Sequence, residues 1–214
     1  MYRPSLSQDQ RTRLHRRGLF LEYFTVSWNL IEAIVAITAG IIASSTALIA
    51  FGIDSLIELI SGAALLWRLL KAGPNASAEQ HSSAERRALY LVAATFFLLA
   101  GYILFESISS LIHREAPLTS LVGLILSIAS LIIMPVLAYT KQLTGKKMGS
   151  RALVADAAET WVCAFLSLAL LLGVGLNYVY GWWWADSVAA MAMLPVIIWQ
   201  GWETLEEAKN EDED

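Results

Sequence analysis

The sequence predicts an all-α integral membrane protein, a bundle of six transmembrane helices with both termini in the cytoplasm. Of its 214 residues, 57% are apolar and only 16% are charged, and the mean hydropathy is +0.55. A soluble domain carries about 25% charged residues, because much of its surface stays wet. The composition therefore argues against a soluble enzyme and a disordered chain. It also argues against a disulfide-built secreted domain, because Cys163 is the only cysteine.

Six stretches are long enough to span the membrane, since about 20 apolar helical residues cross the hydrocarbon layer. They cover residues 19–43, 47–70, 88–112, 118–140, 152–177 and 183–205. Short, nearly uncharged links at 44–46, 114–117 and 178–182 alternate with longer polar loops predicted at 71–87 and 141–151. The expected domains are a basic cytoplasmic N-terminal segment at 1–18, a six-helix membrane domain at 19–205 and an acidic cytoplasmic tail at 206–214.

The lysine and arginine residues predict the orientation. With six spans, all but one of the 15 fall on the side of the termini and the two longer loops, and only Arg114 falls on the other side. Cytoplasmic loops collect positive charge, so we expect this side to face the cytoplasm and the protein to lie in the cell (inner) membrane. A cleaved signal peptide is the alternative interpretation of the N-terminus. However, the first apolar run of this chain is longer than the apolar region of a signal peptide and contains Glu22, Asn29 and Glu32.

Several carboxylates lie inside the predicted spans, whereas no lysine or arginine lies deep within one. An ionisable group in lipid is costly and typically marks an ion path or a proton relay. Acids without cationic partners must stay protonated, hydrogen-bond one another or bind a cation. A helical rise of about 1.5 Å per residue places three pairs in one central layer of the membrane: Asp54 with Glu58, Glu159 with Cys163, and Asn29 with Glu32.

The spacing of these residues predicts a metal site. Asp54 and Glu58 are four residues apart on one helix face, and Glu159 and Cys163 repeat this spacing on the fifth span. Four oxygen and sulfur donors from two antiparallel helices suit a tetrahedral divalent metal such as zinc. Small residues beside them, including Gly52 and Gly62, would let the helices approach closely.

Other roles stay open for several of these residues. The Asp54–Glu58 pair could instead be protonated and hydrogen-bonded to a neighbouring helix, and Cys163 could be a packing residue. Asp156 fits a further ligand, a gate near the inner mouth or a helix-start residue. We expect Asn29 and Glu32 to support the ligands or to extend the ion path, because both lie at the depth of the candidate ligands.

Three segments resemble the transmembrane domain of the cation diffusion facilitator family. Residues 45–58, ending in Asp54 and Glu58, resemble its acidic-x3-acidic motif, and 150–159 resemble the start of its fifth span. The family typically carries His and Asp ligands at the positions that are Glu159 and Cys163 here. The opening of the predicted sixth span, 181–186, is also similar. The resemblance implies six helices with cytoplasmic termini, and export of divalent metals, commonly in exchange for protons.

The departures from the family pattern limit what the resemblance implies. The predicted site contains no imidazole, so the family resemblance does not determine the transported metal. Zinc is the expected metal, and cadmium, iron, cobalt and manganese are alternatives. We expect a compact member without the family's usual cytoplasmic C-terminal domain. Dimerisation through that domain is therefore not implied, and whether the chain forms a homodimer stays open.

The expected function is a secondary transporter that exports a zinc-like divalent metal in exchange for protons. The sequence predicts no enzyme, no resident cofactor and no nucleic-acid partner; the partners are the metal ion, protons and the lipid bilayer. An ion gradient is the expected energy source, because no Gly-x4-Gly-Lys-Ser/Thr loop occurs. The alternatives are a passive cation pathway and a non-transporting scaffold or accessory protein on the same fold.

Overall fold

The computed structural model describes residues 7–43, 46–73, 78–114 and 121–210, and these contain six α-helices. They are α1 (Gln8–Ala43), α2 (Thr46–Lys71), α3 (Ala78–His113), α4 (Leu121–Met148), α5 (Arg151–Tyr180) and α6 (Ala185–Asn210). All but α2 contain a described stretch long and apolar enough to cross a membrane. The described part of α2 contains no such stretch, and it carries the charged residues Asp54, Glu58 and Arg68. The prediction of a six-helix bundle is confirmed.

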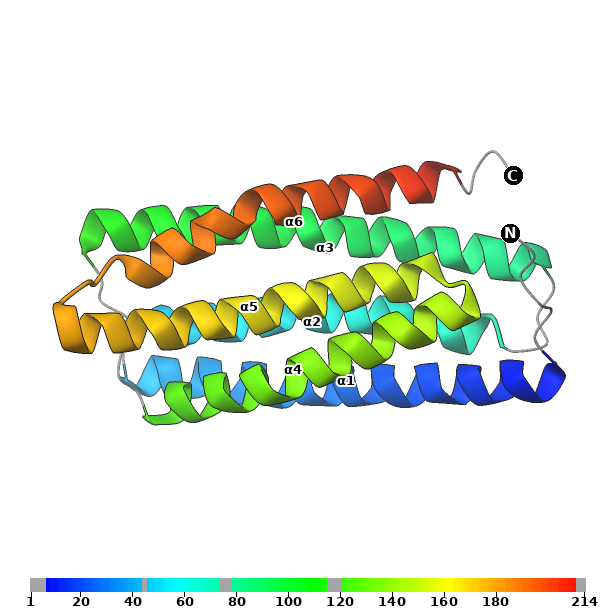
Figure 1. The fold of residues 1–214 in the computed structure, drawn as a ribbon, viewed down its shortest axis with the longest axis horizontal. Helices are drawn as coiled ribbons and strands as arrows, with labels where there is room; N and C mark the ends of the chain where they lie inside the picture. Colours follow the sequence, from blue (N-terminus) through cyan, green and yellow to red (C-terminus); the bar gives the residue numbers. More distant parts are fainter. Residues whose placement is uncertain (1–6, 44–45, 74–77, 115–120, 211–214) are drawn as a thin grey trace.

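Helices α2 and α5 lie in the centre of the bundle (Figure 1). They contact each other, and α1 and α4 pack along one side of them while α3 and α6 pack along the other. Because Asp54 and Glu58 lie on α2 while Glu159 and Cys163 lie on α5, the two helices that carry the predicted ligands are direct neighbours.

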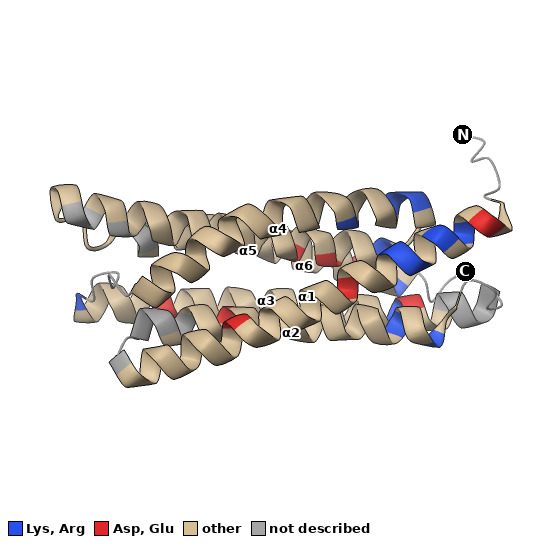
Figure 2. Ribbon diagram, turned by 90° about the horizontal axis from the view of Figure 1, so that it is seen from below, with Lys and Arg blue, Asp and Glu red and all other residues tan. Residues whose placement is uncertain are grey.

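Helix α1 begins and helix α6 ends at the same end of the bundle, where most of the lysine and arginine residues also lie (Figure 2). We call this the basic end. The arrangement agrees with the orientation predicted from the sequence, in which the positively charged end of the bundle faces the cytoplasm.

The distribution of apolar and ionisable side chains is the reverse of that in a soluble protein. Large apolar side chains such as Phe20 and Ile42 are 69% and 81% exposed, whereas Glu22, Glu32 and Glu159 are at most 1% exposed. A lipid solvent explains this distribution, because apolar side chains gain contacts with lipid tails and ionisable groups turn to the bundle interior.

The two long polar loops predicted from the sequence are wrong. Helix α3 begins at Ala78, and α4 continues to Met148, which leaves only Gly149 and Ser150 between α4 and α5. Gly149 ends α4 with a φ of 73°, and the Ser150 hydroxyl accepts a hydrogen bond from the Leu153 backbone N–H at 3.2 Å, capping α5. Hydropathy detects only the apolar part of a helix, but backbone hydrogen bonds continue through the polar residues beyond it.

Glycines allow α1 and α2 to approach closely, as predicted. A Cβ atom at Gly52 would lie 2.6 Å from Cγ1 and 3.1 Å from the backbone N of Ile37 on α1. A Cβ at Gly62 would lie 3.1 Å from Cγ2 of Thr25. This close contact holds the acidic residues of α1 next to those of α2.

Candidate metal site and ion path

Asp54, Glu58 and Cys163 come together in the interior of the bundle. The three side chains are buried, with 8%, 2% and 3% of their surface exposed. The Cys163 thiol on α5 lies beside both carboxylates of α2. The Cys163 thiol therefore lies next to both α2 carboxylates across the α2–α5 contact, and their joint ligation of a metal stays a prediction.

The carboxylate of Glu58 lies beside the Thr160 hydroxyl and the Cys163 thiol, but among the described residues neither of its oxygens accepts a hydrogen bond of good geometry. Buried polar atoms are nearly always hydrogen-bonded, because an unpaired one loses its water without replacement. Glu58 is also the acid that lies within electrostatic range of Asp54, Asp156 and Glu159. It is thus the member of the predicted set that interacts with each of the other three candidate ligands.

Glu159 faces α3 as well as α2. Its Oε2 accepts a hydrogen bond from the Thr95 hydroxyl on α3 at 3.1 Å, and its Oε1 has no partner among the described residues. In this conformation, no three or more His, Cys, Asp or Glu side chains of the described residues are grouped so that they could hold a metal ion. The four candidate ligands line one region of α2 and α5, and their joint ligation of a metal stays a prediction.

Glu32 connects three helices beside this region. It accepts a hydrogen bond from the Ser55 hydroxyl of α2 at 3.1 Å and another from the Ser130 hydroxyl of α4. Asn29, one turn earlier on α1, donates to the Thr25 carbonyl at 3.1 Å, and its own carbonyl oxygen has no partner in the described part of the chain. Glu32 lies within electrostatic range of Asp54 and Glu58, which fits a supporting role.

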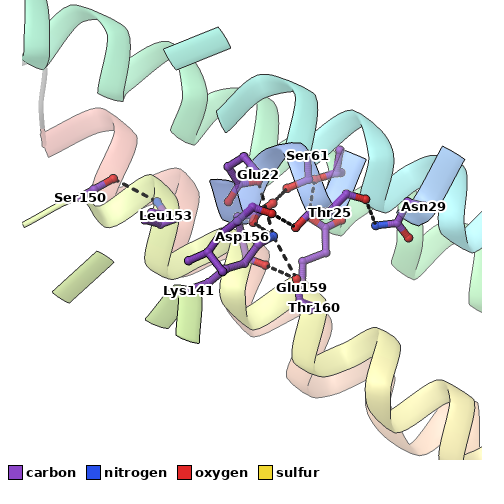
Figure 3. Close-up of polar contacts among 12 residues, drawn as sticks. Glu22, Thr25, Asn29, Ser61, Lys141, Ser150, Leu153, Asp156, Glu159 and Thr160 are labelled. Atoms are coloured by element: carbon purple, nitrogen blue, oxygen red, sulfur yellow. Dashed lines mark hydrogen bonds and ion pairs between the residues drawn. The ribbon is translucent and has the colours of Figure 1, made fainter. Parts of the chain in front are cut away.

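Lys141 is buried among acids, which corrects one sequence inference. Its side chain is fully buried, its ammonium donates to Asp156 Oδ2, and the same nitrogen lies 3.6 Å from Glu22 Oε2 (Figure 3). The Ser61 hydroxyl of α2 donates to the other oxygen of Asp156 at 2.6 Å. The inference that no cation accompanies the buried acids is therefore wrong for Asp156 and Glu22.

The sequence held a signal for this burial. Helix α4 buries a stripe of residues three or four positions apart, which comprises Ser127, Ser130, Met134, Leu137, Ala138, Lys141, Thr144 and Gly145. Lys141 continues the apolar face toward the basic end, at a point where a loop was expected. Extending the helical period beyond the apolar run would have placed Lys141 on the buried face.

A second buried ion pair lies near the basic end and was also missed. Arg68 of α2 pairs with Glu85 of α3 at 2.5 Å. Glu85 also accepts hydrogen bonds from the Ser150 hydroxyl at 2.9 Å and the Ala152 backbone N–H at 2.8 Å. This carboxylate therefore ties α2, α3 and the start of α5 together.

The amino-acid sequence matches a known family of membrane proteins. The model of the cation efflux transmembrane domain matches residues 23–211. The chain belongs to the cation efflux family. Membership confirms the six-helix membrane fold and the multi-pass membrane localisation predicted from the sequence, and it places the chain in a family of cation efflux proteins.

Two curated relatives are similar over most of this chain. Transmembrane protein 163 of Xenopus laevis is 28% identical over 170 residues, which is 79% of this chain and 58% of the relative. The uncharacterized transporter sll1263 of Synechocystis is 27% identical over 169 residues, 78% of this chain and 54% of the relative. The aligned part of this chain thus spans a little over half the length of these two relatives.

Proposed function

We propose that this cation efflux family member exports a zinc-like divalent metal in exchange for protons, with Asp54, Glu58, Glu159 and Cys163 as the ligands. The observation that carries the proposal is Glu58, a buried carboxylate that lies beside the Cys163 thiol and interacts electrostatically with Asp54 and Glu159. Three carboxylates and one thiolate supply donors that suit zinc and cadmium, and the carboxylates also suit manganese.

Competition between the metal and protons supplies the exchange mechanism. Metal ligation requires deprotonated carboxylates and a thiolate, so metal binding releases protons and protonation releases metal. Exchange follows if the bundle exposes the same ligands to each side of the membrane in turn, as in carriers with sites near the midplane. The ligand-bearing helices α2 and α5 are the elements that must move relative to the others. Glu32 and Asp156 extend the polar region along the path.

A flux experiment with the purified chain in proteoliposomes tests this function. We expect saturable uptake of zinc and cadmium that an opposing proton gradient accelerates and that moves protons in the opposite direction. Saturation distinguishes a carrier from a pore. Flux that does not saturate and ignores the proton gradient would establish a passive pathway, and absence of flux for every divalent metal would favour a scaffold or accessory protein.

Replacing Cys163 with serine is expected to shift the metal preference. A hydroxyl is a harder and weaker ligand than a thiolate, so the ratio of cadmium to manganese transport should fall by roughly tenfold. Competition between the two metals in the same vesicles measures the ratio. Ala164→Ser, which adds a hydroxyl at the next buried position of α5, is the matched control. An unchanged ratio in Cys163→Ser would make Cys163 a packing residue.

A further inference from the structure

We propose that the Lys141 ammonium neutralises the acidic residues at the entrance of the ion path and that an incoming divalent metal displaces it. This inference rests on the proposed function and deepens it. It assigns Asp156 and Glu22 as a transient cation-binding station on the basic-end side of the candidate ligands. Lys141 then sets the affinity for the metal, because the metal must displace it.

The contacts of Lys141 place one cation among acids from three other helices. The ammonium of α4 bonds to Asp156 of α5, lies 3.6 Å from Glu22 Oε2 of α1, and contacts the Thr160 hydroxyl at 3.4 Å. Glu58 of α2 is within its electrostatic range. Figure 3 shows Lys141, Glu22, Asp156 and Ser61 converging in this part of the bundle.

This cluster contains more carboxyl groups than cationic groups. One ammonium faces the carboxyl groups of Glu22, Asp156 and Glu58, all fully or almost fully buried. Among the described residues, neither oxygen of Glu22 accepts a hydrogen bond, and its contact with Lys141 is a 3.6 Å ion pair. The buried carboxyl group of Glu22 therefore has lone pairs that no hydrogen bond uses and that a cation could bind. A divalent ion supplies more charge to this cluster than a lysine does.

The station lies about one helical turn from the candidate ligands on both central helices. Ser61, which donates to Asp156, follows Glu58 by three residues on α2, and Asp156 precedes Glu159 by three residues on α5. Both steps lead toward the basic end, because α2 ends there and α5 begins there. A cation that moves from the basic end to Glu58 therefore meets Asp156 first, where Lys141 now neutralises it.

Zinc binding by the full chain in detergent tests the proposal. We expect Lys141→Gln, which removes the charge and keeps a side chain of similar length, to lower the zinc concentration for half-maximal thermal stabilisation by roughly tenfold. Lys141→Arg retains the charge and should not gain affinity. An unchanged or higher midpoint in Lys141→Gln would overturn the inference and leave Lys141 a purely structural ion pair.

A measurement on the unaltered protein covers the case in which Lys141→Gln does not fold. Displacement by zinc frees the amine, so acetylation of Lys141 by a small amine reagent, read by mass spectrometry, should rise several-fold with zinc. The exposed Lys146 and Lys147 are internal controls whose labelling should not change. Equal labelling of Lys141 with and without zinc would contradict the inference. If zinc, cadmium and manganese all fail to stabilise the unaltered protein, the proposed transport function fails as well. If a metal stabilises the unaltered protein and only the Lys141 results are negative, the proposed transport function stands.

Discussion

Replacing Asp54 with asparagine is expected to abolish divalent metal transport while the bundle stays folded. The change removes one negative charge and keeps the volume of the side chain, which lies beside Glu58 and Cys163 between α2 and α5. Losing a carboxylate donor from a site of four ligands should reduce zinc flux by more than roughly a hundredfold. Initial rates of zinc uptake into proteoliposomes measure the loss.

Two controls separate loss of a ligand from loss of the fold. Glu203→Gln neutralises an exposed acid on α6 and should transport at the rate of the unaltered protein. Asp54→Asn should keep its thermal unfolding midpoint in the absence of metal and lose the stabilisation that zinc gives. Undiminished zinc and cadmium flux in Asp54→Asn would remove Asp54 from the mechanism.

The fold was predictable from the sequence because lipid constrains it strongly. A chain in the membrane must satisfy its backbone hydrogen bonds within each segment, so apolar runs of sufficient length become helices. The ends of these helices were not predictable by the same reasoning. Helix α4 continues past its apolar part to Met148, where Gly149 takes a positive φ and ends it. Hydropathy reports contact with lipid, whereas the end of a helix depends on local backbone geometry.

The candidate site was predictable in part. The four-residue spacing of Asp54 and Glu58 predicted that they share one face of α2, and both lie beside Cys163 of α5. That these residues ligate a metal stays a prediction. The sequence did not reveal that Lys141 pairs with Asp156, since a lysine next to an apolar run looks like a residue at the membrane surface. Pairing between helices depends on their rotation about their own axes, which the packing of the whole bundle determines.

Replacing Glu85 with alanine is expected to cause the largest loss of stability away from the ion path. Glu85 Oε2 pairs with Nη2 of Arg68 at 2.5 Å, and Nε and Nη1 of the same guanidinium have no hydrogen-bond partner in the described residues. The variant leaves a buried, unpaired charge and also frees the Ser150 hydroxyl and the Ala152 N–H. Breaking one side of a buried pair should lower the free energy of unfolding by about 3 kcal/mol.

Unfolding of the variant in detergent, by heat or denaturant, measures this loss. Arg13→Ala is the matched control, because its ion pair with Asp9 at 3.0 Å is 79% and 70% exposed and should contribute at most about 0.5 kcal/mol. Glu85→Gln should fall between the two, since an amide oxygen can still accept from Ser150 and Ala152 while the charge opposite Arg68 is lost. Equal stability of Glu85→Ala and Arg13→Ala would show that Arg68 reaches water or another partner once Glu85 is gone, and that the Glu85 junction does not hold α2, α3 and α5 together.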